Sequence, residues 1–231
     1  DHAKDKHDDH AKGKHDDHDK DKHDDHAKDK HDDHDKDKHD DHAKGKHDDH
    51  HGHDHGEFDP HAWQSLSAAL IYVNNITAAL AQVAPNNAKT FYQNRAAYIT
   101  EIKKLDKEIR EMIEGLPQNR RIVVTSHDAF QYFGREYGLT FLAPHGLSTE
   151  SEASAKDIAN LIKQMRARKI SAVFVENITD PRLMQQIAEE TGATVGGKLY
   201  PGALSGPNGP APTYLEMIRH NATTLTGALK S

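Results

Sequence analysis

The spacing of apolar residues changes near residue 117, and this change predicts two kinds of structure along the chain. From about residue 60 to residue 115, apolar side chains recur every three or four positions, which is the period of helices that bury one face. Beyond residue 117, short β-branched runs alternate with helical stretches, which is typical of a parallel sheet. Residues 1–56 contain no apolar residue other than alanine, so no buried element is predicted there.

The first stretch predicts two helices. One opens at Asp59, a good N-cap, with Pro60 at the first helical position, and it ends at Pro85. The second runs from about residue 87 to 115, and its length of about 42 Å suits a strut better than an ordinary domain helix. The stripe of the first helix that we expect to be buried is Trp63, Leu66, Leu70, Val73, Ile76, Leu80 and Val83. The stripe of the second is Phe91, Tyr98, Ile102, Leu105, Ile109 and Met112.

The second stretch predicts four strand–helix units in series. Such a series forms a parallel sheet with helices on both faces. Right-handed crossovers then bring the C-terminal ends of all the strands to one edge, where ligands of such sheets bind. The expected strands are residues 121–125, 139–143, 172–175 and 194–200, and the expected helices are residues 128–137, 155–168, 181–191 and 213–229.

Residues 1–56 are seven copies of an eight-residue phrase such as DHAKDKHD, the last of them degenerate. They hold 16 of the 20 His, with 20 Asp and 12 Lys. Subtracting these from 37 acidic and 30 basic residues leaves 17 and 18, so the repeat carries −8 and residues 57–231 carry +1. A charged repeat without larger apolar residues predicts disorder.

Two interpretations of the repeat remain open. It is either a solvated stretch or a metal-capturing one, because imidazole and carboxylate bind zinc, copper and nickel. Capture would weaken in acid, since free imidazole takes up a proton near pH 6.5. The repeat residues next to the folded part, expected to bind metal at low affinity, are His50, His51, His53 and His55.

Several classes of protein are disfavoured. The absence of Cys excludes a disulfide framework and a thiolate zinc site. No GxSxG, P-loop, GxGxxG or HExxH motif supports an enzyme. Lys and Arg of residues 57–231 form no basic stripe, so nucleic acid is not an expected partner. No uninterrupted apolar run of about 18 residues is present, which predicts a protein peripheral to the membrane.

Three polar residues are candidate metal ligands. His127 directly follows the first strand at a helix N-terminus, where it could bind metal in the neutral state or merely cap the helix. Glu176 ends the third strand and could be a ligand or a capping or hinge carboxylate. His61 could be a ligand in the first turn of its helix or one more His of the repeat. Structural roles fit His145 and His220 better.

Several stretches resemble the solute-binding proteins of zinc/manganese ABC importers, also described as the metal-binding cluster A-I or zinc-uptake family. Together they span residues 57–231 in the order of that family. They are DPHAW (59–63), the long helix, VVTSHDAFQYFGREYGL (123–139), GLSTESEAS (146–154), VFVEN (173–177) and TYLEMIRHN (213–221). Many zinc members also carry a His/Asp-rich loop just before DPHAW, where the repeat stands here.

The resemblance implies an α/β fold of two lobes joined by a long linking helix, with metal held between the lobes. The chain would then comprise a disordered His-rich repeat (1–56), a remnant of the N-terminal lobe (57–85), the linking helix (86–116) and a parallel-sheet C-terminal lobe (117–231). The strands that open the first lobe, together with the family's first His ligand, are absent from the sequence. We therefore expect the helix within residues 57–85 to be loosely held.

The resemblance also implies a ligand set. His61 corresponds to the His of the family's DPHxW motif. His127 corresponds to a position that is His in zinc-type members and tends to be Glu in manganese-type members. Gly202 stands where the family often has an Asp ligand, because this chain reads LYPGALS instead of a pattern like LYSDALS. Water, Glu176 or a His of the repeat could complete the shell.

The implied function is high-affinity zinc capture by the extracytoplasmic substrate-binding component of a zinc ABC importer. The repeat would collect metal, and the transported ligand would be Zn²⁺ in preference to Mn²⁺. The expected partner is the permease of the importer, the expected location is the periplasm or a lipid anchor on the outer face of the cytoplasmic membrane, and the protein is expected to be a monomer. The alternative is a truncated or diverged metal-buffering protein, or a metal-binding adhesin, that is not coupled to a transporter.

Overall fold

The computed structural model describes residues 58–146 and 153–230, which lie within one compact unit of the chain. The repeat, with its predicted disorder and its low-affinity metal sites, lies outside the described residues. The helices are α1 (Leu66–Val83), α2 (Ala88–Glu114), α3 (Gln131–Tyr137), α4 (Ala155–Arg168), α5 (Arg182–Thr191) and α6 (Tyr214–Lys230). Short 3₁₀ turns occupy η1 (Ala62–Gln64), η2 (Pro85–Asn87) and η3 (Gln118–Arg120).

Four parallel strands form the sheet, in the order β2-β1-β3-β4. Their bounds are β1 (Ile122–Val124), β2 (Thr140–Leu142), β3 (Ala172–Glu176) and β4 (Thr194–Leu199). The predicted α/β class and parallel sheet are therefore confirmed, with each strand within one or two residues of its expected bounds. The chain passes from β1 to β2 on one side and then crosses to β3 on the other, so the strand order reverses between β1 and β3. Ligands of open α/β sheets bind at that reversal.

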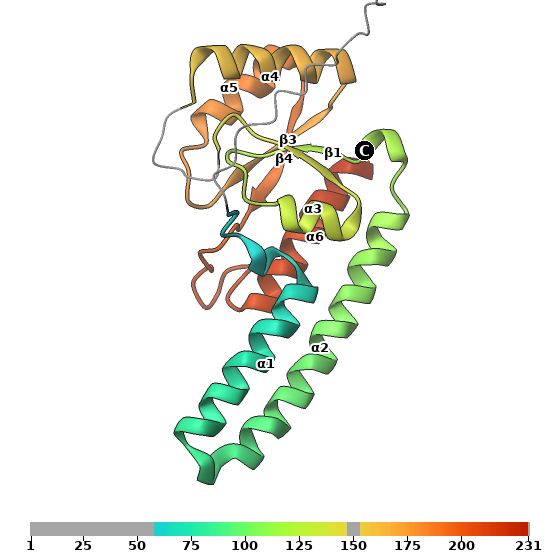
Figure 1. The fold of residues 1–231 in the computed structure, drawn as a ribbon. Helices are drawn as coiled ribbons and strands as arrows, with labels where there is room; N and C mark the ends of the chain where they lie inside the picture. The colour runs from blue at the N-terminus through green and yellow to red at the C-terminus, as the bar shows by residue number, and fades with distance from the viewer. Residues whose placement is uncertain (1–57, 147–152, 231) are drawn as a thin grey trace, which may run out of the picture. The chain divides into compact units, whose positions relative to one another are not determined.

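Alternation along the strands divides the core between two faces. Val123 and Phe174 point into the cluster that contains α3 and α6, whereas Val124, Val173 and Val175 point into the cluster of α4 and α5. In Figure 1, α4 and α5 lie above the sheet and α3 and α6 lie below it. The central strands β1 and β3 are thus buried on both sides, whereas the edge strand β4 is largely exposed.

Helices α1 and α2 form a hairpin whose proximal end joins the core of the sheet (Figure 1). Leu66 and Ala69 of α1 are buried there with Ile102, Leu105 and Ile109 of α2. The distal end packs only helix against helix. As a result, three residues of the α1 stripe that we expected to be buried are exposed: Ile76 (58%), Leu80 (45%) and Val83 (85%). The expectation was wrong for this half of α1, because periodicity identifies an apolar stripe but not what covers it.

The start of α1 also differs from the prediction. Asp59 is not its N-cap; Ser65 is, and its hydroxyl accepts a hydrogen bond from the Ala68 N–H at 3.0 Å. The preceding residues form η1 instead of helix, so the chain turns just after His61. The division into separate domains at residues 57–85, 86–116 and 117–231 stays a prediction. The loose attachment of α1 also stays a prediction.

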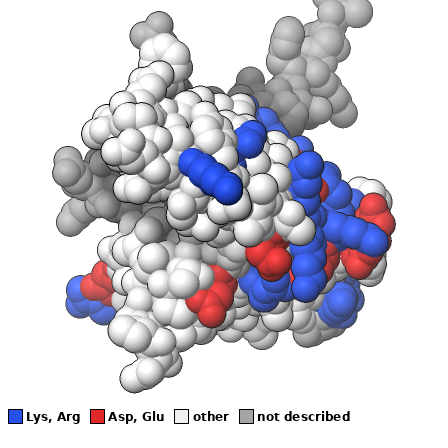
Figure 2. Space-filling model, turned by 90° about the horizontal axis from the view of Figure 1, so that it is seen from below, with Lys and Arg blue, Asp and Glu red and all other residues white. Residues whose placement is uncertain are grey.

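Charge is distributed unevenly over the hairpin. Helix α1 contains no Asp, Glu, Lys or Arg, whereas α2 contains many. Viewed from below, charged side chains gather on one side of the molecule and much of the remaining face carries none (Figure 2). Within the described ranges, α1 is also long and apolar enough to cross a membrane, by length and composition alone, and 17% of it is buried. Asn74, Asn75 and Gln82 interrupt the apolar residues of α1, so it is not an uninterrupted apolar run.

Candidate metal centre

His127 is presented by the reversal point of the sheet. It follows β1 after Thr125 and Ser126, it is 2% exposed, and it lies beside Glu176 at the end of the neighbouring strand β3. The backbone N–H of His127 donates to Glu176 Oε1 at 3.1 Å, and its ring Nδ1 is hydrogen-bonded to Glu176 Oε2. The Thr125 hydroxyl donates to the His127 carbonyl at 3.0 Å. We call β1, residues 125–127 and Glu176 the His127 arm.

His61 is presented by the turn that precedes α1. The residue is 7% exposed. Asp59 Oδ1 accepts a hydrogen bond from the His61 backbone N–H and lies close to the ring Nδ1, both at 2.9 Å. The Gln64 N–H donates to the His61 carbonyl at 3.0 Å and closes the η1 turn. Ser65, at the end of this turn, is hydrogen-bonded to Glu136 of α3. We call residues 59–65 the His61 arm.

The His61 arm is fastened to the loop after β4. Trp63 Nε1 and Gln64 Nε2 both donate to the Pro201 carbonyl, at 2.7 and 2.6 Å. The Tyr214 hydroxyl, at the start of α6, donates to the Trp63 carbonyl at 2.7 Å. These contacts join residues 137–151 positions apart in sequence. They place His61 on the same edge of the sheet as His127.

The two rings converge. The centroids of His61 and His127 are 5.4 Å apart with an interplanar angle of 67°. A tetrahedral metal bound to Nε2 of two imidazoles, with metal–nitrogen distances of about 2.0–2.1 Å, would hold the ring centroids about 5 Å apart. The observed separation therefore fits one shared cation.

The carboxylates determine which ring nitrogen is free to bind a metal. A carboxylate can only accept a hydrogen bond, so Asp59 and Glu176 each hold a proton on Nδ1 of their histidine. The lone pair is then on Nε2 of both rings. A carboxylate behind a histidine is the usual support of a metal-binding imidazole, because it fixes the tautomer and the orientation of the ring. Both arms therefore have the same chemistry.

The structure brings some of the candidate metal ligands together and places His220 apart from them. His61 and His127 come together as the sequence suggested. Glu176 joins them, but both of its oxygens are engaged by His127, so its geometry is that of an orienting group and not of a third ligand. His220 lies apart, with Nε2 at 2.9 Å from the Lys198 carbonyl. His145 pairs with His127 through an isolated parallel bridge of their backbones.

Sequence reasoning missed the role of Asp59, which we had taken for a helix cap. The available signal was its spacing: a carboxylate two residues before a His can reach back to the ring. Its second oxygen, Oδ2, is buried without a hydrogen-bond partner in the described part of the chain. Over residues 58–146 and 153–230, no group of three or more His, Asp or Glu is arranged to hold a metal ion. The described residues thus offer two nitrogens to a cation.

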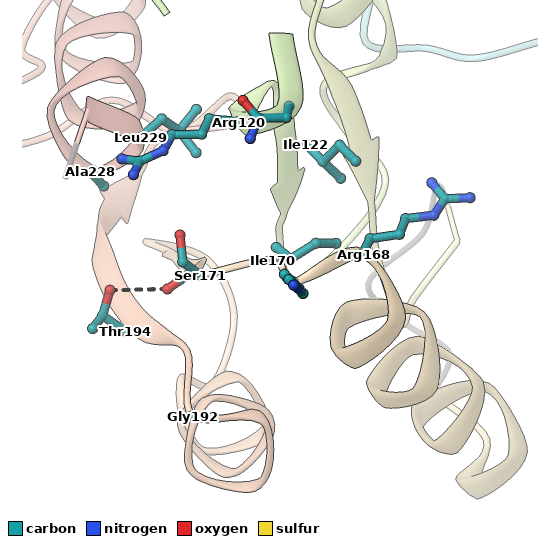
Figure 3. Close-up of a pocket in the computed structure, with 11 residues that line it drawn as sticks. Arg120, Ile122, Arg168, Ile170, Ser171, Gly192, Thr194, Ala228 and Leu229 are labelled. Carbon is teal, nitrogen blue, oxygen red and sulfur yellow. Dashed lines mark hydrogen bonds between the residues drawn. The ribbon is translucent and has the colours of Figure 1, made fainter. Parts of the chain in front are cut away.

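Two cavities lie toward opposite ends of the strands. The larger, about 520 Å³, lies at the opposite end of the strands and is lined by Arg120, Arg168 and Lys169 among others (Figure 3). Arg120 there donates to the carbonyl of Lys230, near the end of α6, at 3.1 Å. Cations at helix C-termini compensate unpaired carbonyls, which explains their presence without a ligand. The smaller cavity, about 260 Å³, adjoins Ser126 at the His127 edge.

A sequence family matches almost the whole chain. The zinc-uptake complex component A family (ZnuA, described as periplasmic) matches residues 2–228. The chain belongs to this family. Its members are solute-binding proteins and not enzymes. The family therefore confirms the prediction that the chain is not an enzyme. The resemblance read from the sequence is thereby confirmed, and so is the predicted location in the periplasm or on a lipid anchor outside the cytoplasmic membrane.

Individual relatives of this ZnuA-family chain differ in the metal that they are named for. The iron-binding protein YfeA of Yersinia pestis is 38% identical over 170 residues, which are 74% of this chain and 55% of YfeA. The manganese-binding lipoprotein MntA of Bacillus subtilis (strain 168) is 37% identical over 178 residues, 75% of this chain and 58% of MntA. The chain thus spans little more than half the length of these curated relatives.

Solved structures agree with the fold. The periplasmic zinc-binding protein TroA of Treponema pallidum matches with a TM-score of 0.73 at 33% identity, over 75% of this chain and 65% of TroA. The Mn-bound periplasmic metal-binding protein of Candidatus Liberibacter asiaticus matches with a TM-score of 0.70 at 35% identity, over 77% of this chain and 66% of that protein. The four-stranded parallel sheet and the long helices are therefore shared with metal-binding proteins of this type.

Proposed function

We propose that this chain is part of the extracytoplasmic substrate-binding component of a metal ABC importer and that it captures a divalent transition metal, zinc in preference to manganese, for delivery to a permease. Nε2 of His61 and Nε2 of His127 would bind the metal. Asp59 and Glu176 would orient the two rings. The observation that carries the proposal is the convergence of two carboxylate-backed imidazoles at the edge where the strand order reverses.

The choice of zinc rests on ligand chemistry. Two neutral imidazoles favour zinc over manganese, which prefers carboxylate and water oxygens. The relatives are named for iron, manganese and zinc, so family membership alone supports only a divalent metal. The His-rich repeat adds nitrogen ligands of the same kind, and we propose that it collects metal at low affinity for this centre.

A second function is favoured by one observation. Within the part of the chain that the structure describes, no third His, Asp or Glu completes the pair. A two-nitrogen centre would exchange metal readily, which suits a metal buffer that is not coupled to a transporter. Affinity separates the two: capture for import needs a centre much tighter than the repeat, whereas a buffer does not.

Trp63 provides the test. It is the sole tryptophan of the chain, and its ring centroid is 5.4 Å from that of His61. Paramagnetic Co²⁺ bound by His61 should therefore quench its fluorescence, and added Zn²⁺ should restore the signal with a midpoint that gives the relative affinity. The full chain can be used, because Trp63 reports mainly on the centre next to it.

His61→Ala and His127→Ala should each weaken the Trp63 response by at least about 100-fold, since loss of a supporting carboxylate alone costs about 10–100-fold. His220→Ala is the matched control, because that ring lies against Tyr200 and the Lys198 carbonyl and not in the pair. Retention of the wild-type response in either member of the pair would exclude the shared centre. Weak binding in the wild type, at the level of the repeat, would favour the buffer.

A further inference from the structure

The loop after β4 contributes no charged side chain to the candidate centre, yet it holds the His61 arm at a single point. The Pro201 carbonyl accepts two hydrogen bonds, from Trp63 Nε1 at 2.7 Å and from Gln64 Nε2 at 2.6 Å. Gln64 is fully buried. Both donors are within three residues of His61, so the Pro201 carbonyl restrains the turn that carries the His61 ring.

The Pro201 carbonyl is itself held in place through the residue that precedes it. The preceding residue, Tyr200, exchanges two hydrogen bonds with Asn221 of α6, from its N–H to Asn221 Oδ1 at 2.9 Å and from Asn221 Nδ2 to its carbonyl at 2.8 Å. Asn221 is fully buried. Helix α6 also holds the His61 arm directly, because the Tyr214 hydroxyl donates a hydrogen bond to the Trp63 carbonyl at 2.7 Å. The arm is therefore fastened to α6 by two independent routes.

Gly202 completes the contact, because it leaves room for the indole. A Cβ at this position would lie 3.3 Å from Trp63 Cζ2 and 3.7 Å from Trp63 Nε1. The first distance is tighter than ordinary van der Waals contact, so any side chain here would press on the ring that binds Pro201. The space beside Gly202 is thus already used by Trp63.

We propose that the Pro201 carbonyl, Trp63, Gln64 and Tyr214 act as a positioning clamp that sets the separation of His61 and His127 for metal binding. The inference rests on the proposed metal centre. In this clamp the loop after β4 acts through the Pro201 carbonyl of its backbone. It positions the ligand His61, which belongs to another segment, and supplies no ligand of its own. Gly202 leaves room for the indole, so a side chain there requires Trp63 to shift.

Tyr214→Phe is the first test, with Tyr137→Phe as its matched control. Each variant keeps the aromatic ring and removes one hydroxyl hydrogen bond, to the Trp63 carbonyl at 2.7 Å or to Asp106 Oδ1 at 2.9 Å. Co²⁺ titration of the full chain, followed by Trp63 fluorescence, should show affinity about 3–10-fold weaker for Tyr214→Phe, the loss expected for one hydrogen bond. The emission of metal-free Trp63 should also shift. Tyr137→Phe should change neither.

Gly202→Asp is the second test, with Gly202→Ala beside it. If the clamp sets the geometry, both variants bind Co²⁺ more weakly than the wild type, and both shift the Trp63 emission. If the centre merely lacks a carboxylate, Gly202→Asp binds more tightly than the wild type while Gly202→Ala does not, and the clamp is refuted. Equal effects of the two Tyr→Phe variants would also refute it.

These outcomes separate the clamp from the centre on which it rests. Absence of a Trp63 response that depends on His61 and His127 in the wild type removes the metal centre itself. A wild-type response that is unchanged in Tyr214→Phe and Gly202→Ala leaves the centre in place and removes only the clamp. Circular dichroism of each variant shows whether a loss of binding comes from loss of the fold.

Discussion

The two histidines of the candidate centre reach it by different routes. His127 is part of the sheet: it follows a strand that is buried on both faces, and its carboxylate partner ends the adjacent strand. His61 is carried by a short turn that side chains fasten to a distant loop. The chemistry at the two rings is the same, yet the first position is fixed by topology and the second by a few side-chain hydrogen bonds.

This difference predicts which substitutions should impair folding together with metal binding and which should impair mainly metal binding. Damage to the His127 arm should disturb folding and binding together, because its groups are in the core. Damage to the His61 arm should disturb binding with less change in folding, because this arm lies outside the sheet and is held by a few side-chain hydrogen bonds. Three predictions test this contrast beyond the histidine variants and the clamp.

The largest effect is expected from the supporting carboxylates. Glu176→Gln and Asp59→Asn should each weaken Co²⁺ binding by about 10–100-fold, since both leave an imidazole without its orienting charge. Glu176→Gln should also lower the free energy of unfolding by about 1.5–3 kcal/mol, because it removes charge-assisted hydrogen bonds from a residue that is 2% exposed. Urea denaturation measures this loss in the free energy of unfolding. An equal loss of stability in Asp59→Asn would contradict the contrast between the arms.

A smaller effect is expected at alkaline pH. Burial is the main cause that raises the pKa of Tyr214, and burial followed by the nearby Asp106 raises the pKa of Tyr137. The folded state therefore holds both phenolic protons more tightly than the unfolded chain. The resulting stability is complete below the unfolded pKa of about 10 and is lost as the pH rises above it.

Urea denaturation at several pH values between about 8 and 11, a range that brackets the unfolded tyrosine pKa, measures this loss. The free energy of unfolding of the wild type should fall above about pH 10, and Tyr214→Phe combined with Tyr137→Phe should flatten that fall. Because the folded protein keeps the Tyr214 proton over this pH range, the Trp63 emission of the folded wild type should stay constant. An identical pH slope in the double variant would show that other groups are responsible.

The smallest effect is expected at the far end of α1. Ile76→Ala should change the free energy of unfolding by less than about 0.5 kcal/mol and leave metal binding intact, because this side chain is 58% exposed and the His61 arm is fastened at its own end. Ile109→Ala is the matched control: the side chain is fully buried, and the loss should be about 2–5 kcal/mol. A comparable loss for Ile76→Ala would mean that the distal half of α1 is covered in solution.

The sequence predicted the parts of the molecule that local pattern controls. Short apolar runs, β-branched at residues 121–125, predicted the strands, and the strand–helix alternation predicted the parallel sheet. His127 could be placed at that edge because a residue directly after a buried strand has few other positions available. The pattern of apolar residues was less informative for α1, where Ile76 and Val83 repeat with helical period but have no core to enter.

The His61 arm could not be predicted in the same way. Asp59 and Ser65 are both good N-caps, and the choice between them depends on contacts of Trp63 and Gln64 with a residue 137–138 positions away. The acceptor is a backbone carbonyl, which every residue carries, so it leaves no mark in the sequence. The family resemblance supplied His61 as a ligand, whereas its mode of attachment required the structure.

The proposed centre requires a single cation that is bound by both rings. The most direct measurement is anomalous diffraction at the zinc edge from crystals of the full chain grown with Zn²⁺. We predict one peak about 2.0–2.1 Å from Nε2 of His61 and from Nε2 of His127, the usual zinc–imidazole distance. A zinc peak that contacts only one of these nitrogens, or zinc bound elsewhere with both rings left free, would contradict it.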